Sequence, residues 1–157
     1  MASEFQRIAI LGTGLIGGSF GLAVRRALPE TRVVGWDRAD VLKAAGARGA
    51  IEVGVTDLAE AVAGADLVYV ALPVGATLEV LPQLARHVAP PALVTDACSV
   101  KAAIVRAAAE PFRGVAHFLG GHPLAGKEVA GIEHADAELF RGTRYALIAA
   151  KENADPR

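Results

Sequence analysis

The feature that most constrains the fold of this chain is a glycine-rich stretch directly after its first apolar segment. Residues 7–11 read RIAIL, and residues 12–19 read GTGLIGGS. An apolar run followed by this glycine spacing and by helix-forming residues predicts a strand, a tight turn and a helix. A second apolar run, residues 32–36, ends at Asp37. Strand, glycine loop, helix and acid in this order are typical of a dinucleotide-binding unit.

Each glycine of the loop has its own predicted role. Gly12 permits the tight turn, Gly14 lets a pyrophosphate approach the backbone, and Gly17 lets the helix pack close to the sheet. The N–H groups and the positive end of the helix dipole then face the phosphates. The residues expected to contact the phosphates are Gly12, Thr13, Gly14, Leu15, Ile16 and Gly17.

Asp37 and Arg38 bear on which nicotinamide cofactor the loop would hold. A carboxylate at position 37 can accept hydrogen bonds from the ribose hydroxyls and repels a 2′-phosphate, which favours NAD. The adjacent guanidinium of Arg38 could instead receive that phosphate, so NADP stays open. Both residues are expected at the cofactor, with NAD preferred.

Length and composition limit the class of protein. With 157 residues and a net charge of −1, the chain is one domain with no basic face for nucleic acid or anionic membrane. Its single cysteine, Cys98, allows no intrachain disulfide, which fits a reducing compartment such as the cytoplasm. The N-terminus lacks the pattern of a signal peptide, and no spacing of His, Cys and carboxylates predicts a metal site.

Apolar runs alternate with helical stretches along the whole chain. The predicted strands are residues 8–11, 32–36, 67–72, 93–95, 115–119 and 145–149, with a short additional strand considered within 49–55. The predicted helices are residues 15–27, 39–47, 58–63, 76–88 and 100–110, with Asp57 and Ser99 as candidate N-caps. Short, continuously apolar strands alternating with helices predict an α/β fold: a Rossmann-type, doubly wound, mostly parallel sheet with helices on both faces. This domain is expected to span residues 1–150, and the polar residues 151–157 to begin a connection to a further domain.

Two further stretches are expected after the carboxyl ends of strands, where open α/β sheets bind ligands. Residues 95–101 read TDACSVK, and residues 120–128 read GGHPLAGKE. Together with GLIGGS at 14–19, they resemble the prephenate/arogenate dehydrogenase family of tyrosine biosynthesis. The resemblance covers nearly the whole chain, and the three motifs occur in the family's order.

The resemblance implies a reaction and a set of site residues. The family oxidises a ring carbinol by hydride transfer to a nicotinamide cofactor, with loss of the ring carboxylate. By resemblance, His122 accepts the carbinol proton, Ser99 contacts the substrate hydroxyl or the nicotinamide, and Glu128 lies at the mouth of the site. Each also has a plainer reading: a loop histidine, a helix cap and a solvated carboxylate.

Several neighbouring residues are less specific. Leu72 and Pro73 end the fourth predicted apolar run and are expected to contact the dinucleotide, although a simple strand terminator fits them almost as well. Lys101 belongs to the SVK motif but is assigned no role, since a simple exposed lysine in the first helical turn also fits it. His117 is interpreted as a core histidine and Cys98 as a small packed side chain.

The family normally carries a second, largely helical domain that forms a homodimer and binds the substrate carboxylates. This chain is therefore expected to be the cofactor-binding part of a longer enzyme, with little turnover alone. Two alternatives remain: a non-catalytic dinucleotide-binding module, and another dehydrogenase such as a β-hydroxyacid type. The sequence does not choose between prephenate and arogenate.

Overall fold

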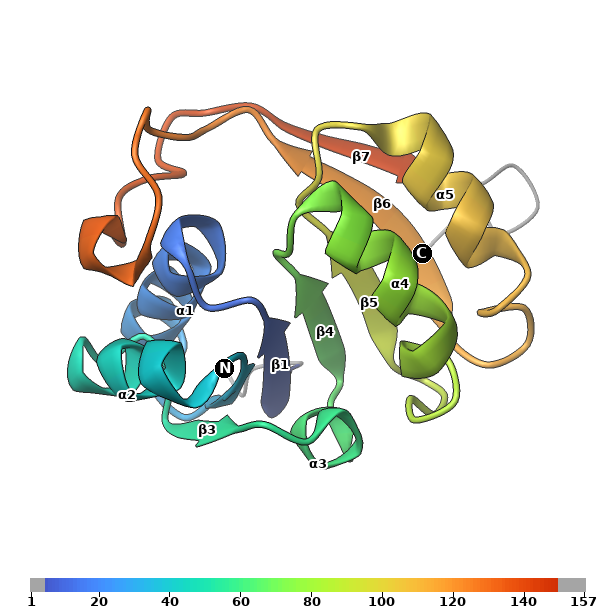
Figure 1. Cartoon of the computed structure of the whole chain (residues 1–157), viewed down its shortest axis with the longest axis horizontal. Coiled ribbons are helices and arrows are strands. Elements are labelled where there is room, and N and C mark those ends of the chain that lie inside the picture. Colours follow the sequence, from blue (N-terminus) through green and yellow to red (C-terminus); the bar gives the residue numbers. More distant parts are fainter. Residues whose placement is uncertain (1–4, 150–157) are drawn as a thin grey trace.

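A computed structural model describes residues 5–149, which form one seven-stranded sheet with helices on both faces (Figure 1). The strands are β1 (Arg7–Leu11), β2 (Arg32–Trp36), β3 (Val53–Val55), β4 (Leu67–Val70), β5 (Leu93–Asp96), β6 (His117–Pro123) and β7 (Tyr145–Ala149). The helices are α1 (Leu15–Ala27), α2 (Ala39–Ala47), α3 (Leu58–Val62), α4 (Val74–Leu84), α5 (Lys101–Ala109) and the short 3₁₀ helix η1 (Ile132–His134). None of these helices is long and apolar enough to cross a membrane.

The strand order is β3-β2-β1-β4-β5-β6-β7, and only β7 runs antiparallel to its neighbour. This order places β1 and β4 side by side at the point where the chain changes direction across the sheet. Ligands of open α/β sheets bind at that point, beyond the carboxyl ends of the strands. The Rossmann-type fold predicted from the sequence is therefore confirmed.

Two apolar cores lie on the opposite faces of the sheet. One contains Val68, Leu81 and Ile104, which join the sheet to α4 and α5. The other contains Ile10, Val24 and Leu42, which join the sheet to α1 and α2. Successive side chains of a strand point to opposite faces, so a strand that feeds both cores must be apolar throughout. The buried strand β1 shows this, because Ile8 through Leu11 are all at most 1% exposed.

The first half of the chain follows the predicted element boundaries closely. α1, α2 and β2 have the predicted ends, and the additional strand considered within 49–55 is β3. Asp57 is the N-cap of α3, where its carboxylate accepts a hydrogen bond from the backbone N–H of Glu60 (2.8 Å). The sequence predicts this cap because an Asp side chain can accept a hydrogen bond from a free N–H of the first helical turn.

The region from β4 to α5 departs from the predicted boundaries. β4 ends at Val70 rather than at residue 72, and α4 spans Val74–Leu84 rather than 76–88. Pro73 is the N-cap of α4, so Leu72 and Pro73 lie in the strand-to-helix turn. The Ser99 cap was predicted wrongly: Val100 is the N-cap of α5, and no side chain caps that helix.

The largest error concerns β6, predicted at 115–119 but observed at His117–Pro123. Glycines and a His-Pro pair discourage a strand assignment, yet the antiparallel partner β7 pairs with this stretch up to Pro123. His122 therefore lies within a strand rather than after one. His117, predicted to be a core histidine, is exposed at the start of β6. β7 is an edge strand with alternating exposure, so it is not covered on both faces as its continuous apolarity predicted.

Candidate functional site

The glycine loop between β1 and α1 is packed tightly at two positions and open at a third. Gly12 has a φ of +89°, and a Cβ there would lie 2.5 Å from the carbonyl oxygen of Ala71. A Cβ on Gly17 would lie 1.8 Å from the carbonyl oxygen of Gly12. A Cβ on Gly14 would meet nothing within 4 Å. The backbone at Gly14 is thus accessible from outside, while its neighbours hold the turn in shape.

The N-terminus of α1 beside this loop is electropositive and uncapped. Gly14 is the N-cap, no side chain bonds to the first-turn N–H groups, and the first turn contains no acid. The N–H groups at a helix start, together with the helix dipole, bind anions such as phosphates. Leu15 and Ile16, two of the predicted contacts, supply the first of these groups.

Asp37, at the end of β2, is bound to the same loop. Its Oδ2 accepts hydrogen bonds from the backbone N–H of Thr13 (2.8 Å) and from the Thr13 hydroxyl (3.3 Å). Its Oδ1 accepts the backbone N–H of Arg38 (2.8 Å). These bonds fix the carboxylate beside the turn, where it retains lone pairs for further donors.

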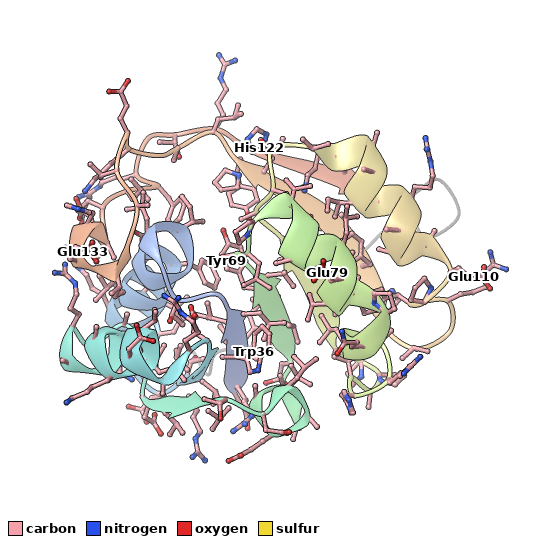
Figure 2. The ribbon with its side chains drawn as sticks, in the orientation of Figure 1. Trp36, Tyr69, Glu79, Glu110, His122 and Glu133 are labelled. Carbon is pink, nitrogen blue, oxygen red and sulfur yellow. The ribbon has the colours of Figure 1, made fainter. Side chains whose placement is uncertain are left out.

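A cleft of about 400 Å³ extends from Asp37 across the carboxyl edge of the sheet. Its lining residues are Trp36, Asp37, Arg38, Thr56, Leu72, Ala76 and Glu79. Trp36 and Glu79 are labelled in Figure 2. The indole N–H of Trp36 donates to the carbonyl of Thr56 (3.0 Å), so this ring forms a fixed wall. Arg38 keeps 79% of its side chain exposed, with only a distant ion pair to Asp40 (3.8 Å). The cleft joins three of the predicted cofactor residues, Asp37, Arg38 and Leu72.

A buried ion pair links the second and third motifs at the same edge. Asp96 at the end of β5 is fully buried and pairs with Lys101 at the start of α5, whose side chain is 14% exposed. Lys101 Nζ also donates to the carbonyl of Gly121 in β6 (2.6 Å). Lys101 is therefore not the simple exposed lysine that its position also allowed. The sequence alone did not lead us to predict an ion pair between Asp96 and Lys101. Their five-residue spacing across a strand-to-helix turn is nevertheless visible in the sequence.

The three candidate catalytic residues lie on separate segments. His122 is half-buried near the end of β6, next to the segment that leads into α5 (Figure 2). Ser99 is exposed in the turn between β5 and α5, and Glu128 is exposed in the loop after β6. The ion pair brings the turn that carries Ser99 and the strand that carries His122 together. Within residues 5–149, no group of three or more potential metal ligands gathers.

Two tyrosines that sequence reasoning did not single out meet beneath this edge. Tyr69 of β4 is 1% exposed and stacks on Phe20 of α1, with ring centroids 4.0 Å apart. The Tyr145 hydroxyl donates to the Tyr69 hydroxyl (3.4 Å). Burial raises the pKa of both phenols, and that of Tyr69 is raised far more. Both groups stay neutral near physiological pH and link β4 to the edge strand.

The last two residues of GLIGGS contact another part of the chain. A Cβ on Gly18 would lie 2.4 Å from Ile132 of η1, and the Ser19 hydroxyl accepts the backbone N–H of Asp136 (2.9 Å). Figure 1 shows the chain crossing from β6 to η1, beside α1, before it returns to β7. Gly18 and Ser19 therefore seat this connection on α1, which explains their presence without a cofactor contact.

Comparison with known proteins identifies the group to which this architecture belongs. Residues 20–157 match the family model described as prephenate dehydrogenase, nucleotide-binding domain. The prephenate dehydrogenase of Lactococcus lactis is 40% identical over 144 residues, which is 90% of this chain and 40% of that protein. This chain thus spans less than half the length of that relative.

Two solved structures share the fold closely. Prephenate dehydrogenase from Aquifex aeolicus, in complex with hydroxyphenyl propionate and NAD+, has a TM-score of 0.90 at 28% identity, covering 99% of this chain and 55% of that one. Synechocystis arogenate dehydrogenase has a TM-score of 0.86 at 32% identity, covering 96% and 52%. The glycine loop, the strand order and these matches agree, and the chain belongs to the prephenate dehydrogenase family, as a nucleotide-binding domain.

Proposed function

We propose that this chain is the cofactor-binding part of an enzyme that oxidatively decarboxylates prephenate or arogenate with NAD. One structural observation carries the proposal. The open glycine loop with Asp37 and the strand end with His122 occupy the same carboxyl edge of one sheet. A dinucleotide that crosses this edge can reach from one to the other. Membership of the prephenate dehydrogenase family supports the choice of substrate.

The residues present fit a nicotinamide dinucleotide. The open backbone at Gly14 and the uncapped start of α1 suit a pyrophosphate, and Asp37 suits the ribose hydroxyls. The cleft between Asp37 and Leu72 has the dimensions for an adenosine, with Leu72 as an apolar wall. Pro73, next to Leu72 in the strand-to-helix turn, is proposed to contact the dinucleotide as well. When bound, the nicotinamide supplies the acceptor for the hydride.

The chain's own residues would handle the proton and the position of the substrate. The substrate carbinol loses its hydroxyl proton as the hydride departs, and a ring nitrogen of His122 accepts that proton. The Ser99 hydroxyl, which both donates and accepts, bridges the carbinol and the imidazole. Glu128 is exposed in the loop after β6. By its resemblance to the family motif, we assign it to the mouth of the site. The released ring carboxylate leaves as carbon dioxide.

NAD is favoured over NADP because the Asp37 carboxylate is held at the ribose end of the cleft by Thr13. A 2′-phosphate brought close to that carboxylate would be repelled by its negative charge. Among the residues that line the cleft, the exposed guanidinium of Arg38 is the one group that would attract a 2′-phosphate and so favour NADP.

The chain spans 40% of its Lactococcus relative, so we infer that it acts within a longer enzyme. From the family resemblance, we propose that this enzyme is cytoplasmic and forms a homodimer through a further domain. The domain proposed here covers residues 1–150, and the proposed connection at 151–157 lies outside the described residues. Without groups to hold the substrate carboxylates, the isolated chain would bind NAD and turn over slowly, because lost orientation lowers rates by orders of magnitude.

The decisive experiment replaces His122 with Asn in the full-length enzyme and in this chain. We expect turnover of prephenate or arogenate to fall at least a hundredfold, with NAD affinity unchanged. His117→Asn is the matched control, since His117 is exposed at the opposite end of the same strand. Unchanged turnover in His122→Asn would refute the catalytic role.

A second candidate function is a non-catalytic dinucleotide-binding module. The open glycine loop and Asp37 favour it equally, because both would bind a dinucleotide without any substrate being turned over. Under this alternative, NAD binds with similar affinity, but neither substrate is consumed by any form of the protein. A β-hydroxyacid dehydrogenase would instead oxidise β-hydroxyacids and leave prephenate and arogenate untouched.

A further inference from the structure

Gly121, the residue before His122, has both of its backbone polar groups bound by charged side chains. Its N–H donates to Oδ1 of Asp96 (3.1 Å), and its carbonyl accepts from Nζ of Lys101 (2.6 Å). β5 pairs with β6 only as far as Thr95 with Leu119. Beyond that ladder pair, the side chains of Asp96 and Lys101 bind the backbone polar groups of Gly121 in place of a backbone partner.

Asp96 also holds the turn that carries Ser99. Its Oδ2 accepts the backbone N–H of Cys98 (2.9 Å) and pairs with Lys101. The carboxylate thus receives donors from three segments: the turn after β5, the start of α5 and β6. Ser99 lies within the first of these segments, between Cys98 and Lys101, and His122 follows Gly121 in the third.

The junction is too close for any side chain at position 121. A Cβ on Gly121 would lie 2.4 Å from the carbonyl oxygen of Asp96 and 2.8 Å from the Thr95 hydroxyl. β6 therefore meets the end of β5 backbone to backbone, and a small shift of either segment would break the contacts with Asp96. A charged pair with fixed hydrogen-bond directions restricts such a shift more than apolar packing does.

A gain in folding stability does not by itself explain why Asp96 and Lys101 form a buried ion pair. Apolar replacements of buried ion pairs are often neutral or stabilising, because desolvation offsets the attraction between the charges. We propose that Asp96 and Lys101 are positioning residues that hold His122 and Ser99 in register for proton transfer. This inference rests on the proposed function, and it adds a device that keeps the two reacting segments together.

The test uses a variant that removes both charges, Asp96→Asn with Lys101→Met. Lys101→Met alone would leave a buried carboxylate unpaired and could unfold the chain. The double variant retains an acceptor at position 96 and the aliphatic part of position 101. Its matched control is Glu110→Gln with Arg113→Met, which removes an exposed ion pair (2.9 Å) just beyond α5.

Amide hydrogen exchange in this chain gives the first readout. We expect exchange at Gly121 and His122 to accelerate at least tenfold in the double variant, while amides of β1 and β4 change less than twofold. NADH binding should stay within threefold of the wild type. A uniform acceleration across the sheet, or none at Gly121, would overturn the proposal, because either result denies a local clamp.

Turnover in the full-length enzyme gives the second readout. We expect kcat to fall at least tenfold with KM for NAD unchanged, and no further fall when the double variant is added to His122→Asn. An additive loss in that background would contradict action through His122. Absence of prephenate or arogenate turnover in the wild-type enzyme would refute the proposed function instead, and hydrogen exchange would still decide whether the clamp exists.

Discussion

Asp37 at the end of β2 accepts a hydrogen bond from the backbone N–H of Thr13 in the glycine loop, with N and Oδ2 2.8 Å apart. The bond joins the two parts of the dinucleotide fingerprint before any cofactor arrives. A carboxylate already fixed beside the loop loses little side-chain entropy on binding a ribose, which favours affinity. The acid therefore shapes the loop as well as facing the cleft.

Replacement of Asp37 by Asn should reduce NAD affinity about tenfold, because hydrogen bonds to a charged acceptor contribute about 1.5–3 kcal/mol. The amide keeps one acceptor for the Thr13 N–H, so the fold should persist. NADP affinity should hold or rise, since the repelling charge is gone. Calorimetric titration with both cofactors measures the ratio, and Asp40→Asn, at an exposed acid on α2, is the control. An unchanged ratio would contradict the proposed ribose contact.

Alanine at Gly14 and at Gly17 should have opposite consequences. Gly14→Ala adds a Cβ into open space, so thermal stability should stay the same while NAD affinity falls at least tenfold. Gly17→Ala places its Cβ 1.8 Å from a backbone oxygen, and we expect a loss of at least about 3 kcal/mol in unfolding free energy. Urea unfolding and NADH fluorescence separate the two effects. Equal stability of the two variants would show that the turn is less constrained than its packing indicates.

The buried Tyr69 and its partner Tyr145 predict a loss of stability in alkali. Burial raises the pKa of Tyr69 and of Tyr145, so the folded state keeps protons that the unfolded state releases above pH 10. The stability that these protonated phenols contribute is fully present below pH 10. It is lost as the pH rises from there toward their pKa values in the folded state. The raised Tyr69 phenol should lower the unfolding free energy by about 1.4 kcal/mol per pH unit in that window. Urea titrations between pH 9 and pH 11.5 measure this slope.

Tyr69→Phe is the variant that isolates this effect. It should show a shallower decline above pH 10 than the wild type, because one titrating phenol is removed. All other ionisable groups are common to both proteins and cancel in the comparison. Identical slopes would mean that Tyr69 ionises in the folded state.

Cys98 should be unreactive in the folded chain. The side chain is buried, its Sγ lies 3.3 Å from the Thr77 hydroxyl, and burial raises the pKa of the thiol. Since the thiolate is the nucleophile, Ellman's reagent should react at least a hundredfold more slowly than with the chain in guanidinium chloride. Rapid labelling under native conditions would contradict the packing around this residue.

The sequence determined those features whose cause is local. The glycine spacing, the acid at position 37 and the alternating apolar runs specified the first half of the fold, because turn geometry and apolar burial act on neighbouring residues. Asp57 was identified as a cap for the same reason. The proposed cofactor site is built almost entirely from such local features.

The tertiary structure decided whatever depends on partners distant in sequence. β6 extends through His122 because β7, more than twenty residues later, pairs with it. Lys101 is buried because Asp96 and Gly121 lie at its end, and Tyr69 meets Tyr145 only through the order of the strands. Residue type and spacing record none of these contacts, since the free energy that fixes them arises only when the sheet is assembled.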